Sequence, residues 1–428
     1  MRIVADLHIH SYLSRACSPL LKPACLYEWC QLKGVTVLAT GDFTHPRWFA
    51  ELRDTLVEAE PGLFAVKPDV ARAADEKVFP SCRALVRFVL GVEISCIYKK
   101  GTRVRKVHHL VFLPSFAAAE RFNARLGAIG NLRSDGRPIV GLDSRNLLEL
   151  VLEADPQAVL IPAHAWTPHF AVFGSESGFD SLEECFDDLT PHIFAIETGL
   201  SSDPLMNWRL SALDGVTLIS NSDAHSLEKL AREANLFDTE LSYQGLFDAI
   251  KRRDGRFLKT LEFFPEEGKY HVDGHRKCQA RLDPTETLRR GGLCPVCGTP
   301  VTVGVLHRVE RLADRPQGQP PSDAAGFEHL IPLKEVLSEV LRVGPTSVKV
   351  DAQYRRLLER FGNELSILRE LPLNRLESEF PVLAVALDRM RRGQVSIEAG
   401  YDGEYGRISL LSPQAAAAAP QLALFDAG

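Results

Sequence analysis

Histidine and acidic residues fall at the ends of seven strand-like apolar runs, and this placement constrains the fold more than any other feature of the chain. The runs span residues 2–6, 35–40, 86–93, 107–113, 158–162, 193–197 and 216–220. Helix-like segments alternate with them, which is the pattern of a parallel α/β fold. Seven such units predict a barrel over residues 1–265 rather than an open sheet.

The polar residues at these strand ends are of the types that bind transition metals. They are His8, His10, Asp42, His45, Glu93, His108, His109, His164, Glu197, Asp223 and His225. In a parallel barrel the C-terminal strand ends converge on one face, so these side chains are expected to share a cavity. Imidazole and carboxylate ligands suit zinc, manganese or iron, with magnesium also compatible, and a carboxylate such as Glu93 can bridge two ions. Clustered ions activate water and bind the oxygens of a phosphate ester, which predicts phosphoester hydrolysis.

Two of these assignments stay open on the residues alone. Neighbouring residues of a strand point to opposite faces, so only one of His108 and His109 is expected to bind metal. Glu197 has three candidate roles, which are metal ligand, orienter of a ligand, and substrate contact.

Three motifs in this region resemble those of the polymerase-and-histidinol-phosphatase (PHP) superfamily: DLHIHS at 6–11, GVEIS at 91–95 and NSDAH at 221–225. The resemblance implies a distorted (β/α)7 barrel with two or three divalent metal ions that hydrolyses phosphoesters. It assigns His8, His10, Glu93 and Asp223 to the first metal, Glu93, His109 and His164 to the second, and His225 with Asp42 or His45 to the third. It also implies Asp223, His225 and Glu197 as catalytic residues.

A second metal site is predicted between residues 266 and 315. His275 and Cys278 form one ligand pair, Cys294 and Cys297 form another, and fifteen residues separate the pairs. This is zinc-ribbon spacing, which predicts one structural zinc in a closed tetrahedral site. His271 is a rival to His275 as the fourth ligand.

The ribbon and its surroundings resemble the endonuclease Q family of DNA-repair enzymes. The matching segments are 268–278, 304–315, 197–203 and 401–406, so the resemblance spans nearly the whole chain. It implies cleavage of DNA on the 5′ side of deaminated bases (uracil, hypoxanthine, xanthine) and abasic sites. Basic residues in and after the ribbon, Arg276, Lys277, Arg308 and Arg311, are expected to contact the DNA phosphates. The alternative is a PHP-type phosphatase acting on a small phosphorylated metabolite, which would leave the ribbon unexplained.

The C-terminal part divides into two further segments. Residues 316–411 read as a mainly helical accessory region that ends in a hairpin, and residues 412–428 read as a flexible tail. Within the tail, Gln421, Leu424 and Phe425 resemble the peptide by which bacterial proteins bind the replication sliding clamp. The sliding clamp is therefore an expected partner beside DNA.

Composition agrees with a soluble enzyme of the cytoplasm. The net charge of −6 neither indicates nor excludes nucleic-acid binding, because metal would neutralise several carboxylates. No secretory signal or apolar run long enough for a bilayer is visible, and six of the nine cysteines are scattered, as in a reduced cytoplasmic protein.

Overall fold

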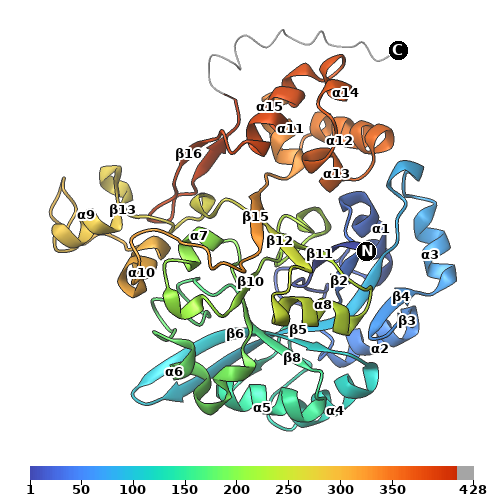
Figure 1. Cartoon of the computed structure of the whole chain (residues 1–428), viewed down its shortest axis with the longest axis horizontal. Helices are drawn as coiled ribbons and strands as arrows, with labels where there is room; N and C mark the ends of the chain where they lie inside the picture. Colours follow the sequence, from blue (N-terminus) through green and yellow to red (C-terminus); the bar gives the residue numbers. More distant parts are fainter. Residues whose placement is uncertain (412–428) are drawn as a thin grey trace.

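The computed structural model describes residues 1–411 and shows an α/β fold with a small ribbon on one side and a helical region above it (Figure 1). The main sheet has the strand order β15-β12-β11-β1-β2-β5-β4-β3, and β6, β7 and β8 attach through β5 and β6. Its strands are β1 (Arg2–Asp6), β2 (Val37–Ala39), β3 (Leu56–Glu60), β4 (Leu63–Val66), β5 (Arg87–Lys100), β6 (Arg103–Leu113), β7 (Ile139–Val140), β8 (Val159–Pro162), β11 (Ala234–Asp238), β12 (Phe257–Glu262) and β15 (Gly326–His329). Strands β9 (Ala195–Glu197) and β10 (Thr217–Ile219) form a separate parallel pair.

Each of the seven predicted strands is present, but the prediction that all of them run parallel is wrong. β1, β2 and β5 are parallel neighbours, whereas β5–β6 and β6–β8 are antiparallel pairs. Only Gly101 and Thr102 connect β5 to β6, and a parallel crossover needs a dozen or more residues. β11 and β12 were not predicted and also pair antiparallel. Because β9 and β10 are not hydrogen-bonded into the main sheet, closure of a seven-unit barrel stays a prediction.

Helices surround the sheet and pack apolar side chains against it. In the α/β part they are α1 (Pro23–Lys33), α2 (Pro46–Thr55), α3 (Pro68–Asp75), α4 (Phe116–Gly127), α5 (Ser144–Ala154), α6 (Leu182–Phe186), α7 (Pro204–Asn207) and α8 (Tyr243–Arg252). Tryptophan and phenylalanine side chains such as Trp48, Trp166 and Phe112 are fully buried beneath them. Within the described residues, no helix is both long and apolar enough to cross a membrane.

The ribbon region lies between two strands of the same sheet. It contains β13 (Asp273–His275), β14 (Ala280–Leu282), α9 (Pro284–Arg289) and α10 (Val305–Leu312). After it, β15 returns to pair in parallel with β12, the strand that precedes the ribbon. β15 lies in the predicted third segment, residues 316–411, and yet belongs to the main sheet. The domain boundaries at residues 265, 315 and 411 stay a prediction.

The C-terminal region is mainly helical and ends in a hairpin, as the sequence predicts. It consists of α11 (Leu333–Leu341), α12 (Val348–Phe361), α13 (Glu364–Arg369), α14 (Asn374–Glu377), α15 (Pro381–Arg391) and the antiparallel strands β16 (Ser396–Glu398) and β17 (Arg407–Ser409). A buried ion pair fixes it to the α/β part, where Lys33 Nζ at the end of α1 lies 2.7 Å from Glu364 Oε2. Gly34 leaves room there for the side chain of Asn363, which a Cβ atom would meet at 2.3 Å.

Candidate metal centre

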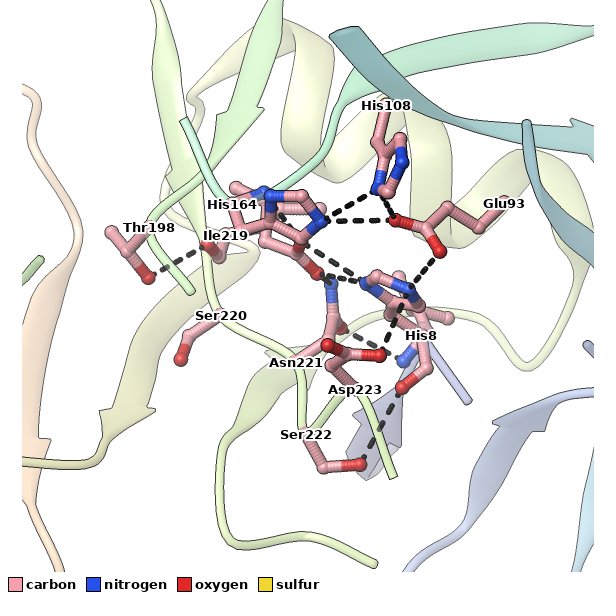
Figure 2. Close-up of polar contacts among 12 residues, drawn as sticks. His8, Glu93, His108, His164, Thr198, Ile219, Ser220, Asn221, Ser222 and Asp223 are labelled. Carbon is pink, nitrogen blue, oxygen red and sulfur yellow. Dashed lines mark hydrogen bonds and ion pairs between the residues drawn. The ribbon is translucent and has the colours of Figure 1, made fainter. Parts of the chain in front are cut away.

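The segments that follow β1 and β10, together with the middle of β5, bring a first group of metal-type ligands together. His8, His10 and Asp223 each offer a ligand atom within 4.8 Å of the others. The Nε2 atoms of His8 and His10 lie 3.5 and 3.1 Å from Asp223 Oδ1, and 3.7 and 3.3 Å from Glu93 Oε2. Figure 2 shows His8, Glu93 and Asp223 pointing toward one another from separate segments of the chain.

The Nδ1 atoms of both histidines face carboxylates that orient the rings. The Glu197 carboxylate oxygens lie 3.1 Å from His8 Nδ1, and Asp42 Oδ1 lies 3.2 Å from His10 Nδ1. An ionised carboxylate can only accept, so each Nδ1 carries the proton and each Nε2 is directed into the centre with its lone pair. Of the three roles open to Glu197, this geometry favours the orientation of a ligand.

Other donors saturate the two orienting carboxylates. Glu197 also accepts from Asn221 Nδ2 at 2.8 Å and from the backbone N–H of His164 at 2.7 Å. Asp42 accepts from the Ser11 backbone and hydroxyl at 2.7 and 2.6 Å and from Ser14 Oγ at 2.8 Å. Asp42 is therefore placed behind His10, and the expectation that it binds the third metal is corrected to that of an orienting residue.

A second ligand group consists of Glu93, His108 and His164. Glu93 Oε1 lies 2.6 Å from His108 Nδ1 and 2.9 Å from His164 Nε2, while Glu93 Oε2 faces the first group (Figure 2). The two oxygens of one buried carboxylate thus point to two adjacent groups. This is the arrangement expected of a carboxylate that bridges two cations.

His108, and not the expected His109, lies in the second group. Because β5 and β6 pair antiparallel, His108 lies opposite Ser95 and shares a face with Glu93, whereas His109 lies opposite Ile94 on the other face. There His109 Nε2 is 2.8 Å from Ser144 Oγ, and its ring packs against Phe186. The assignment of His109 as a ligand is wrong for this reason of register.

The third predicted group is only partly assembled. The ring of His225 lies 4.6 Å from that of His10, and His225 Nδ1 is 3.6 Å from Asp223 Oδ1. His45 lies apart from the ligand groups, because its Nδ1 accepts from the Arg47 backbone and its Nε2 donates to the Arg133 carbonyl. His45 caps α2 and is not placed to share a cation with His225.

The buried carboxylates of the centre are stabilised by positive charge next to them. Burial lowers the pKa of His8, but the carboxylates of Glu197, Asp223 and Glu93 outweigh it and hold that pKa well above its ordinary value. Burial likewise raises the pKa of Glu93, yet His108, His8 and His10 hold it well below its ordinary value. His8 Nε2 is also buried without a hydrogen-bond partner. An unpartnered imidazole nitrogen facing two carboxylates fits a divalent cation.

Arg137 is a member of the centre that sequence reasoning missed. Its Nη1 lies 2.9 Å from Glu93 Oε2, and its side chain is 30% exposed. The preceding Gly136 permits this approach, because a Cβ atom there would lie 2.2 Å from Asp42 Oδ2. Arg137 precedes the short strand β7 in a segment with no periodic pattern, so the sequence carried no signal for it.

The ribbon site is assembled as predicted. His275, Cys278, Cys294 and Cys297 each offer a ligand atom within 4.8 Å of the others, and His275 Nδ1 lies 3.3 Å from Cys297 Sγ. His271 is buried outside this group, so His275 is the fourth member. Three thiols and one imidazole at this spacing fit a structural zinc.

The predicted DNA-contacting residues have different environments. Arg276, Lys277 and Arg311 are exposed. Arg308 is buried, and it donates to the Phe173 and Phe179 carbonyls at 2.9 and 2.8 Å and to Asp180 at 2.6 Å. The prediction for Arg308 is wrong, because these bonds use its guanidinium to fasten α10 to the α/β part. Gln421, Leu424 and Phe425 lie outside the described residues.

Comparison with known proteins finds relatives over the whole chain. The domain family described as the MJ0043 C-terminal domain matches residues 332–394. The uncharacterised protein YqxK of Bacillus subtilis is 29% identical over 422 residues, covering 95% of this chain and 99% of that protein. Protein MJ0043 of Methanocaldococcus jannaschii is 30% identical over 256 residues, but the match spans 58% of this chain and only 31% of that protein.

Two solved structures share the fold from end to end. PfuEndoQ, a lesion-specific endonuclease from Pyrococcus furiosus, matches with a TM-score of 0.83 and 30% identity over 96% of both chains. A complex of endonuclease Q with a 27-mer duplex bearing an abasic lesion at its active site matches with a TM-score of 0.80 and 30% identity, over 95% of this chain and 96% of that one.

The register of β6 generates a test with a matched pair of variants. We expect His108→Ala to lower the metal bound at the α/β centre by about one ion per chain, because one of three ligands is lost. His109→Ala removes the contact with Ser144 and should keep the full metal content. Metal analysis of both purified variants checks this, and metal loss in the second but not the first would contradict it.

The ribbon site generates a separate test. Cys294→Ala should release about one zinc per chain, because a closed tetrahedral site depends on all four ligands. Cys25→Ser, a change at a half-buried cysteine outside the group, is the control. Unchanged zinc in Cys294→Ala, measured by elemental analysis, would refute the assignment.

Proposed function

We propose, since this chain belongs to the endonuclease Q family of the PHP superfamily, that it is a DNA-repair endonuclease acting 5′ of deaminated bases and abasic sites. The bases expected are uracil, hypoxanthine and xanthine. The observation that carries the proposal is Glu93, whose two oxygens face two adjacent ligand groups in a chain that matches a lesion-specific endonuclease along its length.

We assign the divalent cations of this enzyme to the two groups that share Glu93. His8, His10, Glu93 and Asp223 are the proposed ligands of one ion, and Glu93, His108 and His164 those of a second. His225 is the residue placed for a third. When bound, zinc, manganese, iron or magnesium ions at these positions supply activation of water and neutralisation of phosphate charge.

The side chains of the centre differ in their access to a substrate. Glu197 is fully buried, so its proposed role is to hold the His8 ring. The side chains of Asp223 and His225 are 29% and 37% exposed. We therefore keep Asp223 and His225 as the proposed catalytic residues, because they lie where a phosphodiester can reach the centre.

Arg137 is proposed to contact the scissile phosphate. Its guanidinium lies at the partly exposed edge of the centre, next to the carboxylate that would bridge the cations. Once Glu93 is bound to cations, its charge is compensated by them, and the guanidinium is available to a phosphate oxygen. A fixed positive charge at that position stabilises charge that develops on the phosphate.

The main test uses labelled duplexes that carry one deoxyuridine, deoxyinosine or abasic site, incubated with Mn²⁺, Mg²⁺ or Zn²⁺. We expect a nick immediately 5′ of the lesion, no cleavage of the undamaged duplex, and loss of nicking in Asp223→Asn. Hydrolysis of a generic phosphate monoester without nicking would instead support a small-molecule phosphatase. DNA binding without either activity would support a non-catalytic accessory protein.

The role of Arg137 has its own test. Arg137→Gln should lower the nicking rate by about 100-fold, the effect typical of removing one donor to a developing anion. Metal content should not change, since Arg137 is not a ligand. The matched control is Arg133→Gln, which changes an exposed arginine of the same loop. A wild-type rate in Arg137→Gln would exclude the phosphate contact.

Clamp binding remains a proposal from sequence alone. Gln421, Leu424 and Phe425 fit an extended peptide that places two apolar side chains in a groove. We expect the Leu424→Ala/Phe425→Ala double variant to lose binding to the bacterial sliding clamp while nicking free lesion duplexes normally. Clamp binding unchanged in this variant, measured by surface plasmon resonance, would refute it.

A further inference from the structure

Two segments that the sequence analysis singled out, but that the metal centre does not use, lie side by side at the base of the ribbon. The Gly403 backbone N–H donates to the Lys269 carbonyl at 3.0 Å, and the Gly406 N–H donates to the Glu267 carbonyl at 3.0 Å. Asp402 accepts from the Arg276 backbone at 2.7 Å and from Thr302 Oγ1 at 2.6 Å. In Figure 1 the strands at the end of the chain reach down beside β13.

This contact leaves tyrosine rings at the surface. Tyr405 is 73% exposed and Tyr270 is 44% exposed. Their neighbour Tyr401 is buried, so the turn has an apolar anchor and does not need the other two rings for its own packing. Exposed aromatic rings that lie close together mark interaction surfaces more often than isolated exposed residues do.

Cationic side chains lie against two tyrosine rings of this contact. Lys269 Nζ is 4.5 Å from the centre of the Tyr405 ring, and the Arg281 guanidinium is 4.9 Å from that of Tyr401. Tyr270 Oη and Arg276 Nη1 both face Gly403, at 3.6 and 4.0 Å from the position of a Cβ atom there. Lys269, Arg276 and Arg281 are exposed; of the acids in the turn, Glu404 is exposed and Asp402 is already hydrogen-bonded.

We propose that this surface, formed by Lys269, Tyr270, Arg276, Arg281 and Tyr405, binds unpaired nucleotides of DNA. A single strand presents both base faces and phosphates, which match a surface that carries both exposed rings and cations. A paired duplex presents phosphates but keeps its base faces stacked inside, so it would leave both rings unused. The inference rests on the proposed function, because removal of a damaged base from its partner leaves nucleotides unpaired.

Binding to three lesion-free probes tests this surface: a single strand, the fully paired duplex, and a duplex with a central unpaired bubble. We expect Tyr270→Ala/Tyr405→Ala to weaken binding of the single strand and the bubble by on the order of ten-fold, the effect of losing base stacking. Binding of the paired duplex should change less than about two-fold on the same grounds. Tyr270→Phe/Tyr405→Phe keeps both rings and should bind as the wild type does.

Further variants keep the test independent of folding. Val348→Ala removes an apolar side chain on α12 that is 86% exposed, more than either tyrosine, and should bind all probes normally. Lys269→Gln should weaken all three probes and lower their salt dependence, because it removes a phosphate contact. Wild-type affinity of the double alanine variant for unpaired DNA would overturn the proposal. If the double alanine variant lost affinity equally for all three probes, or lost the zinc of the ribbon, the proposal would also be overturned.

Nicking of lesion duplexes, measured on the same preparations, separates this inference from the proposed function. Absence of nicking by the wild type, together with selective loss of single-strand binding in the tyrosine variant, would remove the nuclease assignment and keep the surface. Normal nicking by the wild type, together with unchanged single-strand binding in the tyrosine variant, would keep the nuclease assignment and remove the surface.

Discussion

The centre depends on the carboxylate of Glu93, which is 1% exposed and surrounded by four imidazole groups and one guanidinium group. A buried carboxylate is costly unless each oxygen has a partner of opposite charge or a donor. Here one oxygen faces His108 and His164 and the other faces His8, His10 and Arg137. The strands and the segments after them must therefore place each ligand at the correct depth for this one side chain to be compensated.

The backbone shows the cost of meeting that requirement. Asp42, His164 and Asp223 all have positive φ values, of 48°, 28° and 46°. Non-glycine residues adopt such angles at an energetic cost that the surrounding structure must offset, and they gather at functional sites. Gly199 is part of this compensation, because a Cβ atom there would lie 2.6 Å from the His164 side chain. The loops after the strands are thus shaped by the positions that the ligands need.

Sequence patterns identified the centre but not its detailed geometry. The two-residue spacing of His8 and His10 placed both on one face. The spacing of the ribbon pairs gave Cys278, Cys294 and Cys297, and the structure chose His275 over its rival His271 as the fourth member of that group. The choice between His108 and His109 depended on the pairing of β6 with β5, which the short turn at Gly101 could have revealed. Arg137 and Arg308 could not be assigned, because an arginine's role depends on which acid or carbonyl lies within reach after folding.

The helical region and the ribbon are joined to the α/β part by different physical means. Lys33 and Glu364 form a buried pair whose separation would leave a charge without compensation. Arg308 instead uses backbone carbonyls of the segment near Phe173 and Phe179. Both contacts are polar and directional, so they fix the orientation of each attached region as well as its position.

The return of β15 to pair with β12 at one edge of the main sheet has a consequence for the ribbon as a unit. Both ends of the segment leave from neighbouring strands of one sheet, so the segment is a loop closed by the sheet itself. Backbone pairing of β12 with β15 already offsets the entropic cost of holding the two ends of the segment together. The segment could therefore be lengthened, shortened or exchanged without altering the topology around it. The metal centre and the ribbon can then vary independently of each other within a single polypeptide.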